Sequence, residues 1–409
     1  MKNLIAVFVV LSVAALWCVF IFDNTEENQI KPQTTTVNVT QKESETKENK
    51  IYAVWLTYSE IGALVKDKSK NEYIESLETV FNDLKKNKIN TVFYQCRAFC
   101  DSFYQSEIFP VSKYIGNAGI GFDPFGVFCE TAQAYGISVH CWINPYRVSY
   151  DKEYNNLPRN SPAKALYNKD KTSLIICENG VYLNPAHSES RKLVLDGIKE
   201  ILGKYKVGGI HFDDYFYPES EKLNDKKLYE EYRKQGGKLN LPEWRRENVS
   251  ALVSGVYTLV KSYDHNLIFS ISPSADIKKC KNVFYADVEK WCSEDGFADY
   301  IIPQLYYGFE NESMPFSYVA EEWRSLASQG SVKLICGMAP YKSGSTDNFA
   351  GNGKNEWNEN VNILSRQYEQ VLKSQVWQGF SLFSYSYCFG DNMTENSKKE
   401  IKNLLYVVE

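Results

Sequence analysis

The sequence predicts a (β/α)8 barrel, in which eight parallel strands alternate with helices. From Ile51 onward, apolar strand-like runs alternate with segments of helical periodicity, and eight such runs can be placed. These runs are too uniformly apolar for a sheet with one solvated face, so both faces of the sheet are expected to be covered. A doubly wound open sheet is the alternative. No G-x-G-x-x-G motif follows the first run, which excludes the nucleotide-binding version of that fold.

The elements can be assigned in chain order. The strand candidates are residues 51–57, 90–96, 137–143, 207–213, 267–272, 299–306, 332–338 and 378–385. Apolar residues recur at helical spacing in 74–84, 195–205 and 249–260, which precede the second, fourth and fifth of these strands. Two long connections, 144–186 and 214–243, follow the third and fourth strands. Both are expected over the same face of the barrel, where a cleft is predicted.

The first fifty residues differ in composition from the rest of the chain. Residues 4–22 are uncharged and almost wholly apolar, and this run is long enough to span a bilayer. We expect a membrane anchor or signal segment at 1–22, a flexible polar linker at 23–50 and the (β/α)8 domain at 51–409. No small-x-small cleavage site ends the run, which favours an uncleaved anchor over a cleaved signal peptide, and the flanking charges place the domain outside. The protein is therefore expected to be extracytoplasmic and held at the cell membrane, with a secreted protein as the alternative.

Composition limits the classes of partner. The net charge of −5, without a basic patch, argues against nucleic acid. Aromatic residues make up 14% of the chain and include 29 Tyr, which suits a site that stacks on sugar rings. The ten Cys include no C-x-x-C pair, and the four His have no H-x3-H spacing. We therefore expect neither a metal site nor a cofactor, and a metal-dependent deacetylase is the least favoured function.

The most informative motif is His211-Phe212-Asp213-Asp214-Tyr215-Phe216-Tyr217-Pro218, which follows the short apolar run at 207–210. Two adjacent carboxylates stand where the fourth predicted strand ends. A buried carboxylate is costly unless it is paired or used, and functional residues of parallel α/β folds collect at such strand ends. The alternative is an ordinary acidic turn. The flanking His and three aromatic residues favour a functional site at Asp213 and Asp214.

Other strand ends add polar and aromatic side chains at the same level. The candidate substrate-binding residues are Arg97, Asp101, His140, Trp142, Asn144, Arg147, His211, Tyr215, Gln304, Tyr307 and Tyr385. Further aromatic and polar residues end strands there, namely Trp55, Tyr58, Gln95, Ser272, Tyr306 and Tyr341. For several of them, taken individually, a purely structural role is the alternative: Arg97 as the ion-pair partner of Asp101, and His140 as a buried His of the barrel interior. Their coincidence at one face favours a shared site.

Several long motifs resemble a known family. They are Arg97-x3-Asp101, His140-Cys141-Trp142-Ile143-Asn144-Pro145-Tyr146-Arg147, Tyr182-Leu183-Asn184-Pro185, the segment 209–218 and Pro303-Gln304-Leu305-Tyr306-Tyr307. The chain is similar to bacterial glycosyl-hydrolase-like proteins named for a loose similarity to glycoside hydrolase family 10. The resemblance covers nearly all of 51–390 and implies a (β/α)8 barrel acting on glycans outside the cytoplasm. One branch, in Gram-negative bacteria, cleaves peptide-free peptidoglycan strands. Gly208, where that family usually has Asp, and Cys100, in place of a small residue, depart from its pattern.

The mechanism of the family-10 xylanases does not fit these residues. Those enzymes use Glu residues after the fourth and seventh strands, whereas the seventh strand here ends in Gly337-Met338-Ala339-Pro340-Tyr341. A loop carboxylate such as Asp101 or Glu107 could still supply a second group. The adjacent Asp pair better fits substrate-assisted hydrolysis, in which the acetamide of an N-acetylated sugar attacks the anomeric carbon.

The catalytic residues follow from that mechanism. Asp213 and Asp214 resemble the tandem Asp of barrels that hydrolyse O-linked N-acetylglucosamine, and Tyr306 resembles the Tyr of chitinase-type barrels that holds the acetamide oxygen. Asp213 is assigned as the group that polarises the acetamide and Asp214 as the acid, with the order open. The predicted function is a glycosidase of N-acetylated cell-wall glycan. The alternatives are an inactive glycan-binding protein and a hydrolase of another polysaccharide.

Overall fold

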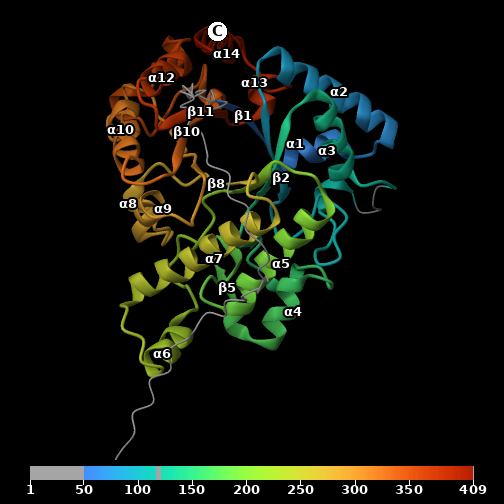
Figure 1. Ribbon diagram of the computed structural model, residues 1–409, viewed down its shortest axis with the longest axis vertical. Coiled ribbons are helices and arrows are strands. Elements are labelled where there is room, and N and C mark those ends of the chain that lie inside the picture. Colours follow the sequence, from blue (N-terminus) through green and yellow to red (C-terminus); the bar gives the residue numbers. More distant parts are fainter. Residues whose placement is uncertain (1–49, 117–120, 409) are drawn as a thin grey trace, which may run out of the picture. The chain divides into compact units, whose positions relative to one another are not determined.

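The computed structural model describes residues 50–116 and 121–408, which fold into a closed barrel of eight parallel strands surrounded by helices (Figure 1). The barrel strands are β1 (Ile51–Leu56), β2 (Thr91–Arg97), β3 (Ser138–Ile143), β7 (Gly209–Phe212), β8 (Ile268–Ile271), β9 (Tyr300–Ile301), β10 (Lys333–Met338) and β11 (Trp377–Leu382). Their order around the barrel is β1-β11-β10-β9-β8-β7-β3-β2. The predicted (β/α)8 barrel is confirmed, and the open-sheet alternative is excluded because β1 pairs with both β2 and β11.

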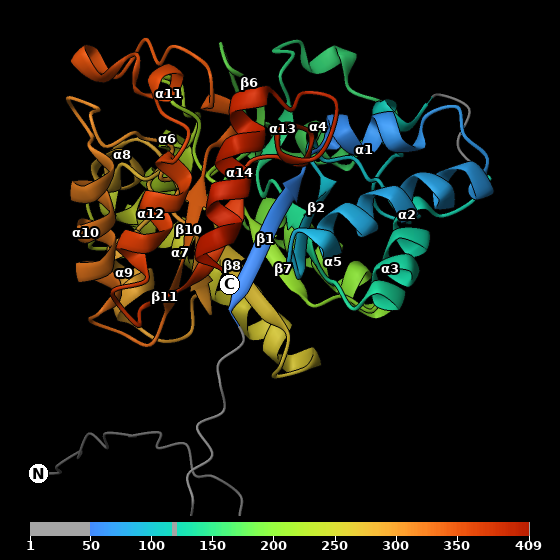
Figure 2. The ribbon, with the colours of Figure 1, turned by 90° about the horizontal axis from the view of Figure 1, so that it is seen from above.

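The helices lie outside the strands, as Figure 2 shows around β1. The helices between and after the barrel strands are α1 (Tyr58–Val65), α2 (Lys70–Lys86), α3 (Pro124–Tyr135), α5 (Ser188–Lys204), α7 (Leu241–Tyr263), α8 (Ile277–Asn282), α9 (Val288–Ser293), α10 (Phe316–Ala327), α11 (Glu356–Glu359), α12 (Ile363–Val371), α13 (Tyr385–Cys388) and α14 (Glu395–Val407). Side-chain caps fix several N-termini. Ser69 with Glu72 begins α2, and Asn240 with Glu243 begins α7, each as a reciprocal capping box.

Two connections are long enough to carry structure of their own. The segment after β3 contains the antiparallel sheet β4-β6-β5 and helix α4; these span Arg147–Ser149 (β4), Pro162–Lys169 (α4), Leu174–Cys177 (β5) and Gly180–Leu183 (β6). The segment after β7 contains α6 (Lys226–Lys234). Both connections leave the C-terminal ends of neighbouring strands, because β3 pairs directly with β7. They therefore build up the same rim of the barrel.

Two hydrophobic clusters stabilise the barrel. The larger lies between the strands and the helices and includes Val54, Val92 and Tyr94. The smaller fills the barrel interior, and its buried members are Ile51, Ala53, Trp55, Phe93, Trp142, Ile302 and Ile335. Successive strand residues point to opposite faces, so each strand supplies both clusters. The nine cysteines of the described chain are buried and free, as expected for Cys that act as small apolar side chains.

The predicted membrane segment, 1–22, and almost all of the predicted linker, 23–50, lie outside the described residues. Among the residues that are described, no helix combines the length and apolar character that crossing a bilayer requires.

Candidate active site

A cavity of about 550 Å³ opens at the C-terminal end of the barrel. Residues from the ends of most strands line it, namely Trp55, Thr57, Tyr58, Ser59, Glu60, Gln95, Trp142, Arg147, Tyr150, Asp213, Asp214, Tyr215, Ser272, Gln304, Tyr306, Tyr341, Phe383, Ser384, Ser386, Tyr387 and Asn392. Strand ends that are far apart in the sequence meet here because the sheet closes on itself. Of the predicted site residues, the cavity contains Asp213, Asp214, Tyr306, Trp142, Arg147, Tyr215 and Gln304.

The adjacent carboxyl groups form part of the cavity wall directly after β7. Asp213 is only 3% exposed, and both of its oxygens accept hydrogen bonds. The indole N–H of Trp142 donates to Oδ2 at 2.9 Å, and the backbone N–H of Tyr215 donates to Oδ1 at 3.2 Å. Asp214 is half-buried and lies near the Gln304 side chain, whose Nε2 donates to the Ser272 carbonyl at 3.0 Å. The first carboxyl group is thus fixed in orientation, and the second is the more accessible.

Both carboxyl groups hold their protons more strongly than usual. Burial, followed by the charge of Asp214, raises the pKa of Asp213 from 3.8 to about 7. Burial also raises the pKa of Asp214, although its own backbone N–H, the nearby Gln304 side chain and the charge of Arg147 act in the opposite direction. Two neighbouring carboxyl groups with raised pKa values retain a proton between them up to neutral pH. The pair can therefore provide an acid and a carboxylate together.

Arg147 brings a positive charge to the same cavity. Its guanidinium is 2% exposed, and it donates from Nε to the Ala98 carbonyl at 3.2 Å and from Nη1 to the Tyr150 hydroxyl at 2.6 Å. Its Cζ lies 3.9 Å from the centre of the Tyr215 ring. Within 50–116 and 121–408, no carboxylate forms an ion pair with this guanidinium. The charge therefore remains available to an anionic or strongly polar ligand.

Comparison with known proteins decides the family. The family description "glycosyl hydrolase-like 10" matches residues 50–354. The chain belongs to the glycosyl hydrolase-like 10 family. It is 30% identical over 356 residues to glycosyl hydrolase YngK of Bacillus subtilis, covering 80% of this chain and 68% of YngK. It is 31% identical over 287 residues to glycosyl hydrolase DigH of Escherichia coli, covering 64% of each chain, so it spans slightly less than two thirds of DigH.

A solved structure shares the barrel. The glycoside hydrolase domain of PgaB from Bordetella bronchiseptica superimposes with a TM-score of 0.60 at 11% sequence identity, covering 87% of this chain and 99% of that domain. At this identity the likeness concerns the fold alone. The predicted resemblance to the glycosyl-hydrolase-like family is confirmed, and the protein is a glycosidase of the glycosyl hydrolase-like 10 family.

Two predicted His residues of this family member lie beneath the cavity and do not line it. His211 is fully buried; it accepts the Trp55 indole N–H at Nε2 (3.0 Å), and its Nδ1 lies 2.9 Å from Ser270 Oγ. Since Nε2 accepts, the ring proton is on Nδ1 and is donated to Ser270. Burial lowers the pKa of His211 well below its ordinary value. A neutral His211 thus positions Trp55, which lines the cavity, and does not contact a ligand there.

His140 lies deeper still. It shares the inward face of β3 with Trp142 but precedes it by two residues, roughly 6.6 Å along the strand. The side chain is 2% exposed, its Nδ1 has no hydrogen-bond partner, and burial lowers its pKa to about 4. A Cβ at Gly208 would be 2.0 Å from Ser138 Oγ and 3.2 Å from this ring, so glycine suits that position. The structure therefore places His140 in the barrel interior, away from any substrate.

Asn144 supports a cavity residue from behind. Gln95 lines the cavity and donates from Nε2 to Asn144 Oδ1 at 2.7 Å, while its Oε1 accepts the backbone N–H of Tyr58 at 2.9 Å. Asn144 itself is 2% exposed, and its Nδ2 has no partner. It orients Gln95 and does not line the cavity.

Two further predicted residues lie elsewhere. Arg97 points away from the barrel interior: its Cζ lies 3.9 Å from the Phe109 ring centre, and a Cβ at Gly197 of α5 would meet its Nη1 at 2.1 Å. Alternation along β2 would have placed it beside Gln95, but a register shift between these two residues turns it outward. Tyr385 likewise points outward and donates its hydroxyl to Asp83 of α2 at 3.2 Å. Their assignment to substrate binding is not supported by these positions.

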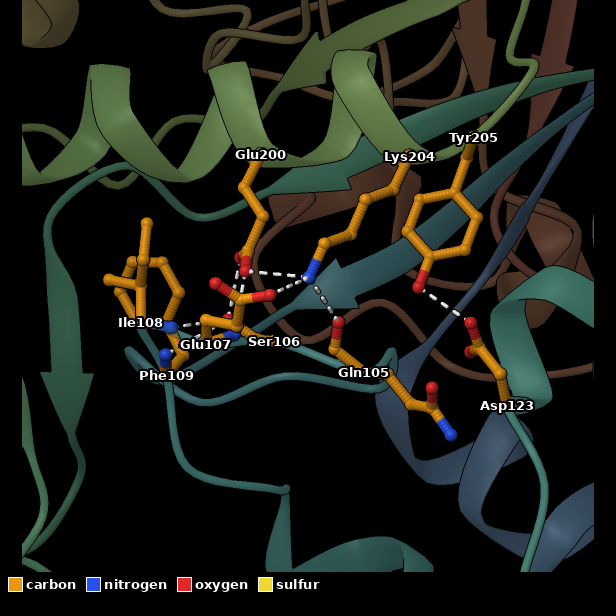
Figure 3. Close-up of polar contacts among 9 residues, drawn as sticks. All are labelled: Gln105, Ser106, Glu107, Ile108, Phe109, Asp123, Glu200, Lys204 and Tyr205. Carbon is orange, nitrogen blue, oxygen red and sulfur yellow. Dashed lines mark hydrogen bonds and ion pairs between the residues drawn. The ribbon is translucent and has the colours of Figure 1, made fainter.

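Asp101 and Tyr307 line neighbouring cavities. Asp101 faces a cavity of about 320 Å³ that shares Tyr150 with the main one. Tyr307 faces another, which shares Gln304 and Tyr306 with the main cavity. Tyr306 and Tyr307 are consecutive, so one reaches the acid pair and the other turns away from it. Glu107, the other loop carboxylate considered, accepts a contact from Lys204 of α5 on the outer surface at 3.4 Å (Figure 3).

The structure adds residues that the strand-end pattern missed. Glu60 lines the cavity, with Oε1 accepting from Ser384 and Ser386 and Oε2 from Thr57. Its signal in the sequence is a capping box with Thr57, which indicates a helix start and no chemistry. The other cavity residues that the pattern missed lie in loops or in the short helices α1 and α13, namely Thr57, Ser59, Tyr150, Phe383, Ser384, Ser386, Tyr387 and Asn392. Only the folded chain brings these segments to the cavity.

Proposed function

We propose that the protein hydrolyses N-acetylated cell-wall glycan, such as peptidoglycan strands, by substrate-assisted catalysis at Asp213 and Asp214. The observation that carries the proposal is this adjacent pair in the cavity wall, both members with a raised pKa. Among the described residues that line the cavity, Glu60 is the only other carboxylate, and both its oxygens are already hydrogen-bonded. A separate nucleophile across the cavity is therefore not supplied, which favours attack by the substrate's acetamide.

Each residue then has a defined task. Asp213, with its oxygens held by Trp142 and Tyr215, accepts a hydrogen bond from the acetamide N–H and aligns the acetamide oxygen with the anomeric carbon. Asp214, the more open group, donates its proton to the departing glycosidic oxygen. The resulting oxazolinium ring opens when water attacks the anomeric carbon, and Asp214 takes the water's proton. General acid catalysis of this kind contributes about 10²- to 10⁴-fold.

Tyr306 and Arg147 complete the proposed site. Tyr306 lines the cavity together with the Asp pair, and burial, followed by Tyr341 and the charges of Asp214 and Asp213, raises its pKa well above the ordinary value and keeps its hydroxyl protonated. It is suited to donate a hydrogen bond to the acetamide oxygen. The unpaired guanidinium of Arg147 is suited to the lactyl carboxylate of a muramic acid unit. A glycan that carries both acetamide and lactyl groups would satisfy all four side chains.

The first experiment tests the role of the acetamide. Purified protein is incubated with peptide-free peptidoglycan strands and with the same strands after removal of the N-acetyl groups, and products are measured by mass spectrometry. We expect cleavage of the acetylated strands only, with retention of anomeric configuration, and inhibition by a thiazoline analogue of the oxazolinium ring. Equal cleavage of both preparations would contradict substrate assistance, and no cleavage of any glycan would favour a binding protein.

A second experiment separates the two carboxyl groups. On a glycan whose leaving group is a sugar, Asp213→Asn and Asp214→Asn should each lower kcat/KM by about 10²- to 10⁴-fold. A nitrophenyl glycoside needs little protonation of its leaving group, so Asp214→Asn should recover most activity on it and Asp213→Asn should not. The opposite pattern would exchange the two roles. Asp196→Asn, an exposed α5 residue paired with Lys192, is the matched control and should match the wild type.

We also propose that the protein is extracytoplasmic and held at the membrane through residues 4–22. This rests on the sequence: an uncharged apolar run that follows Lys2 and precedes Asp23 and Glu26. Protease added to intact cells should digest the barrel, and the protein should sediment with membranes. An intact mass that lacks the first residues would instead indicate a cleaved signal segment.

A further inference from the structure

A second cavity lies beside the catalytic one and is assigned no role in the proposed reaction. Its volume is about 320 Å³, which falls in the range of ligand sites. It is formed by the loop after β2 and by the insertion after β3, and its lining includes Phe99, Asp101, Val111 and Tyr114. Tyr150 lines both cavities, so the two are neighbours along one face of the barrel. A chain longer than the catalytic cavity would meet this second one.

Aromatic side chains form the boundary between the cavities. The Phe99 ring contacts Tyr150 edge-on at 5.0 Å between centroids and Tyr58 edge-on at 5.1 Å. Tyr58 in turn packs against Tyr114 at 4.6 Å. Tyr58 lines the catalytic cavity, whereas Phe99 and Tyr114 line the second one. Such a group of packed rings offers apolar faces on which sugar rings can stack.

Tyr150 is the most exposed member of this boundary, at 53%. Its position is nevertheless fixed, because its hydroxyl accepts a hydrogen bond from Arg147 Nη1 at 2.6 Å and its ring faces the same guanidinium at 4.6 Å. Arg147 is itself buried and held by the Ala98 carbonyl. An exposed ring that is held in place from below loses little freedom when a ligand stacks on it.

Asp101 is the least exposed charged group of the second cavity, whose lining also includes Lys113 and Asp151. The Asp101 carboxyl group is half-buried and accepts the Phe99 backbone N–H at 3.1 Å through Oδ1. Within 50–116 and 121–408 it forms no ion pair. A carboxylate can accept several hydrogen bonds, so Asp101 has capacity for a ligand hydroxyl or amide N–H. Together with Asp151 it outweighs the positive charge of Lys113, so the second cavity disfavours a sugar that carries a carboxylate, in contrast to Arg147 in the first cavity.

The loop that carries Asp101 is anchored to α5 (Figure 3). Glu200 accepts hydrogen bonds from Ser106 Oγ and from the Glu107 backbone N–H, both at 2.6 Å. Lys204 donates to the Gln105 carbonyl at 3.2 Å and to Glu200 at 3.2 Å. At the far end of the loop, the Tyr205 hydroxyl donates to Asp123 at 2.6 Å. The wall of the second cavity is thus tied to the helical layer at several points and is formed before any ligand arrives.

We propose that the second cavity is a remote sugar subsite, which binds a neutral N-acetylated unit of the same glycan chain whose cleavage occurs at Asp213 and Asp214. The proposal rests on the proposed function for the identity of that chain. Tyr150 provides the stacking face, and Asp101 accepts a hydrogen bond from a hydroxyl or acetamide N–H of the sugar. The alternation of a positive and a negative side chain, Arg147 and then Asp101, matches a polymer in which anionic and neutral sugars alternate.

The test measures dependence on chain length. Peptide-free peptidoglycan fragments of two to eight sugars are used, and the ratio of kcat/KM for the longest to that for the shortest cleaved fragment is compared between variants. Asp101→Ala should lower this ratio about tenfold or more, because a hydrogen bond to a charged group is lost. Val111→Trp should lower it as well. Val111 is 52% exposed at the second cavity, so a larger side chain there blocks the cavity without disturbing the core.

Tyr318→Ala is the matched control, since Tyr318 is a 61% exposed tyrosine on the outer helix α10. The control should retain the wild-type ratio. A ratio that is unchanged in both Asp101→Ala and Val111→Trp, while the wild type cleaves the fragments, would overturn the subsite and leave the proposed function standing. Failure of the wild type to cleave any fragment would count against the proposed function. In that case the ratio of the dissociation constants of the longest and shortest fragments is compared between the wild type and the variants. A ratio that is unchanged in both variants would overturn the subsite.

Discussion

Asp213 in the barrel mouth and Glu400 in α14 are almost completely buried, at 3% and 0% exposure, but their carboxyl groups have different partners. Glu400 accepts the backbone N–H groups of Ile363 and Leu364, both at 2.9 Å, and thereby caps the N-terminus of α12. Asp213 accepts only one backbone N–H, and its other partner is the Trp142 indole. Asp213 also stands next to a second carboxyl group and opens to a cavity.

Burial raises the pKa of both groups, so a raised pKa does not by itself identify the active site. For Glu400, the two backbone hydrogen bonds lower the pKa and so offset part of the effect of burial, and the N-terminus of α12 stabilises the charged form. For Asp213, the second largest contribution is the like charge of Asp214, which raises the pKa further. The charge of Glu356 also raises the pKa of Glu400, but it is the smallest of the causes there. A functional carboxyl group is therefore distinguished by a strongly interacting like-charged neighbour and by access to a ligand.

The largest expected difference concerns the pH dependence of stability. The pKa of Asp213 is raised from 3.8 to about 7 on folding, so the folded state binds more protons than the unfolded state between those values. The wild type should therefore lose stability as pH rises through this window, by up to about 4 kcal/mol at 1.36 kcal/mol per pKa unit. Asp213→Asn cannot titrate and should lack this loss. Urea unfolding of both proteins at pH 4.5, 6 and 8 measures the difference.

The change with pH is the decisive quantity in that experiment, because the Asn side chain also alters two hydrogen bonds at every pH. The free energy of unfolding of the wild type minus that of Asp213→Asn should fall between pH 4.5 and 8. Parallel curves would show that Asp213 titrates normally. The comparison with Glu400 would then lose its basis.

A smaller effect is expected at Glu400. Glu400→Ala leaves two buried N–H groups at the start of α12 without acceptors, so the protein should be destabilised by about 2–4 kcal/mol. The kcat of the folded enzyme should remain that of the wild type, because this residue lies in the helical layer. Thermal unfolding and a glycan assay measure the two quantities. Lys399→Ala, at an exposed position of the same helix, should change neither. A fall in kcat without loss of stability would contradict the structural role.

The fold and the acid pair could be predicted from the sequence because both depend on local patterns. Each barrel strand is an apolar run, and strand ends in a closed parallel barrel necessarily meet at one face. Asp213 and Asp214 follow β7 directly, Trp142 is the last residue but one of β3, and Tyr306 lies in the segment that follows β9. Arg97 could not be placed in the same way. A register shift in β2 reverses the expected side of the strand, and no residue type marks that shift.

The depth of a side chain within the barrel could not be predicted from the sequence either. His140 and Trp142 both point inward, yet only Trp142 lines the cavity, since His140 precedes it on the strand. The alternation of side chains along a strand predicts the face of the sheet to which each one points, but it does not predict how deep in the barrel that side chain lies. Residues outside the barrel strands, in loops and in helix α1, also could not be placed from the sequence. Tyr150 and Glu60 reach the cavity through tertiary contacts, namely the Arg147 hydrogen bond for Tyr150 and the Ser384 and Ser386 hydrogen bonds for Glu60.

The smallest expected effect sharpens the role of Trp142. Its indole hydrogen bond at 2.9 Å lowers the pKa of Asp213, although burial and Asp214 outweigh it. Trp142→Phe keeps an aromatic ring in the barrel interior and removes this donor. The pKa of Asp213 should therefore rise, and because Asp213 acts as a carboxylate, the ascending acidic side of the kcat/KM profile should move to higher pH by up to about one unit. We expect kcat/KM at the optimum to fall about tenfold or less, because Asp213 loses one of its two orienting hydrogen bonds.

Trp244→Phe provides the control, because both tryptophans are 6% exposed but Trp244 belongs to α7 in the helical layer. Its pH profile should coincide with that of the wild type. Two outcomes for Trp142→Phe differ in meaning. A lower kcat/KM with an unshifted profile would mean that Trp142 contacts the sugar and leaves the acid pair unaffected. A shift to lower pH would mean that the indole destabilises the charged pair, which contradicts the hydrogen bond to Asp213 and with it the orientation on which the acetamide mechanism depends.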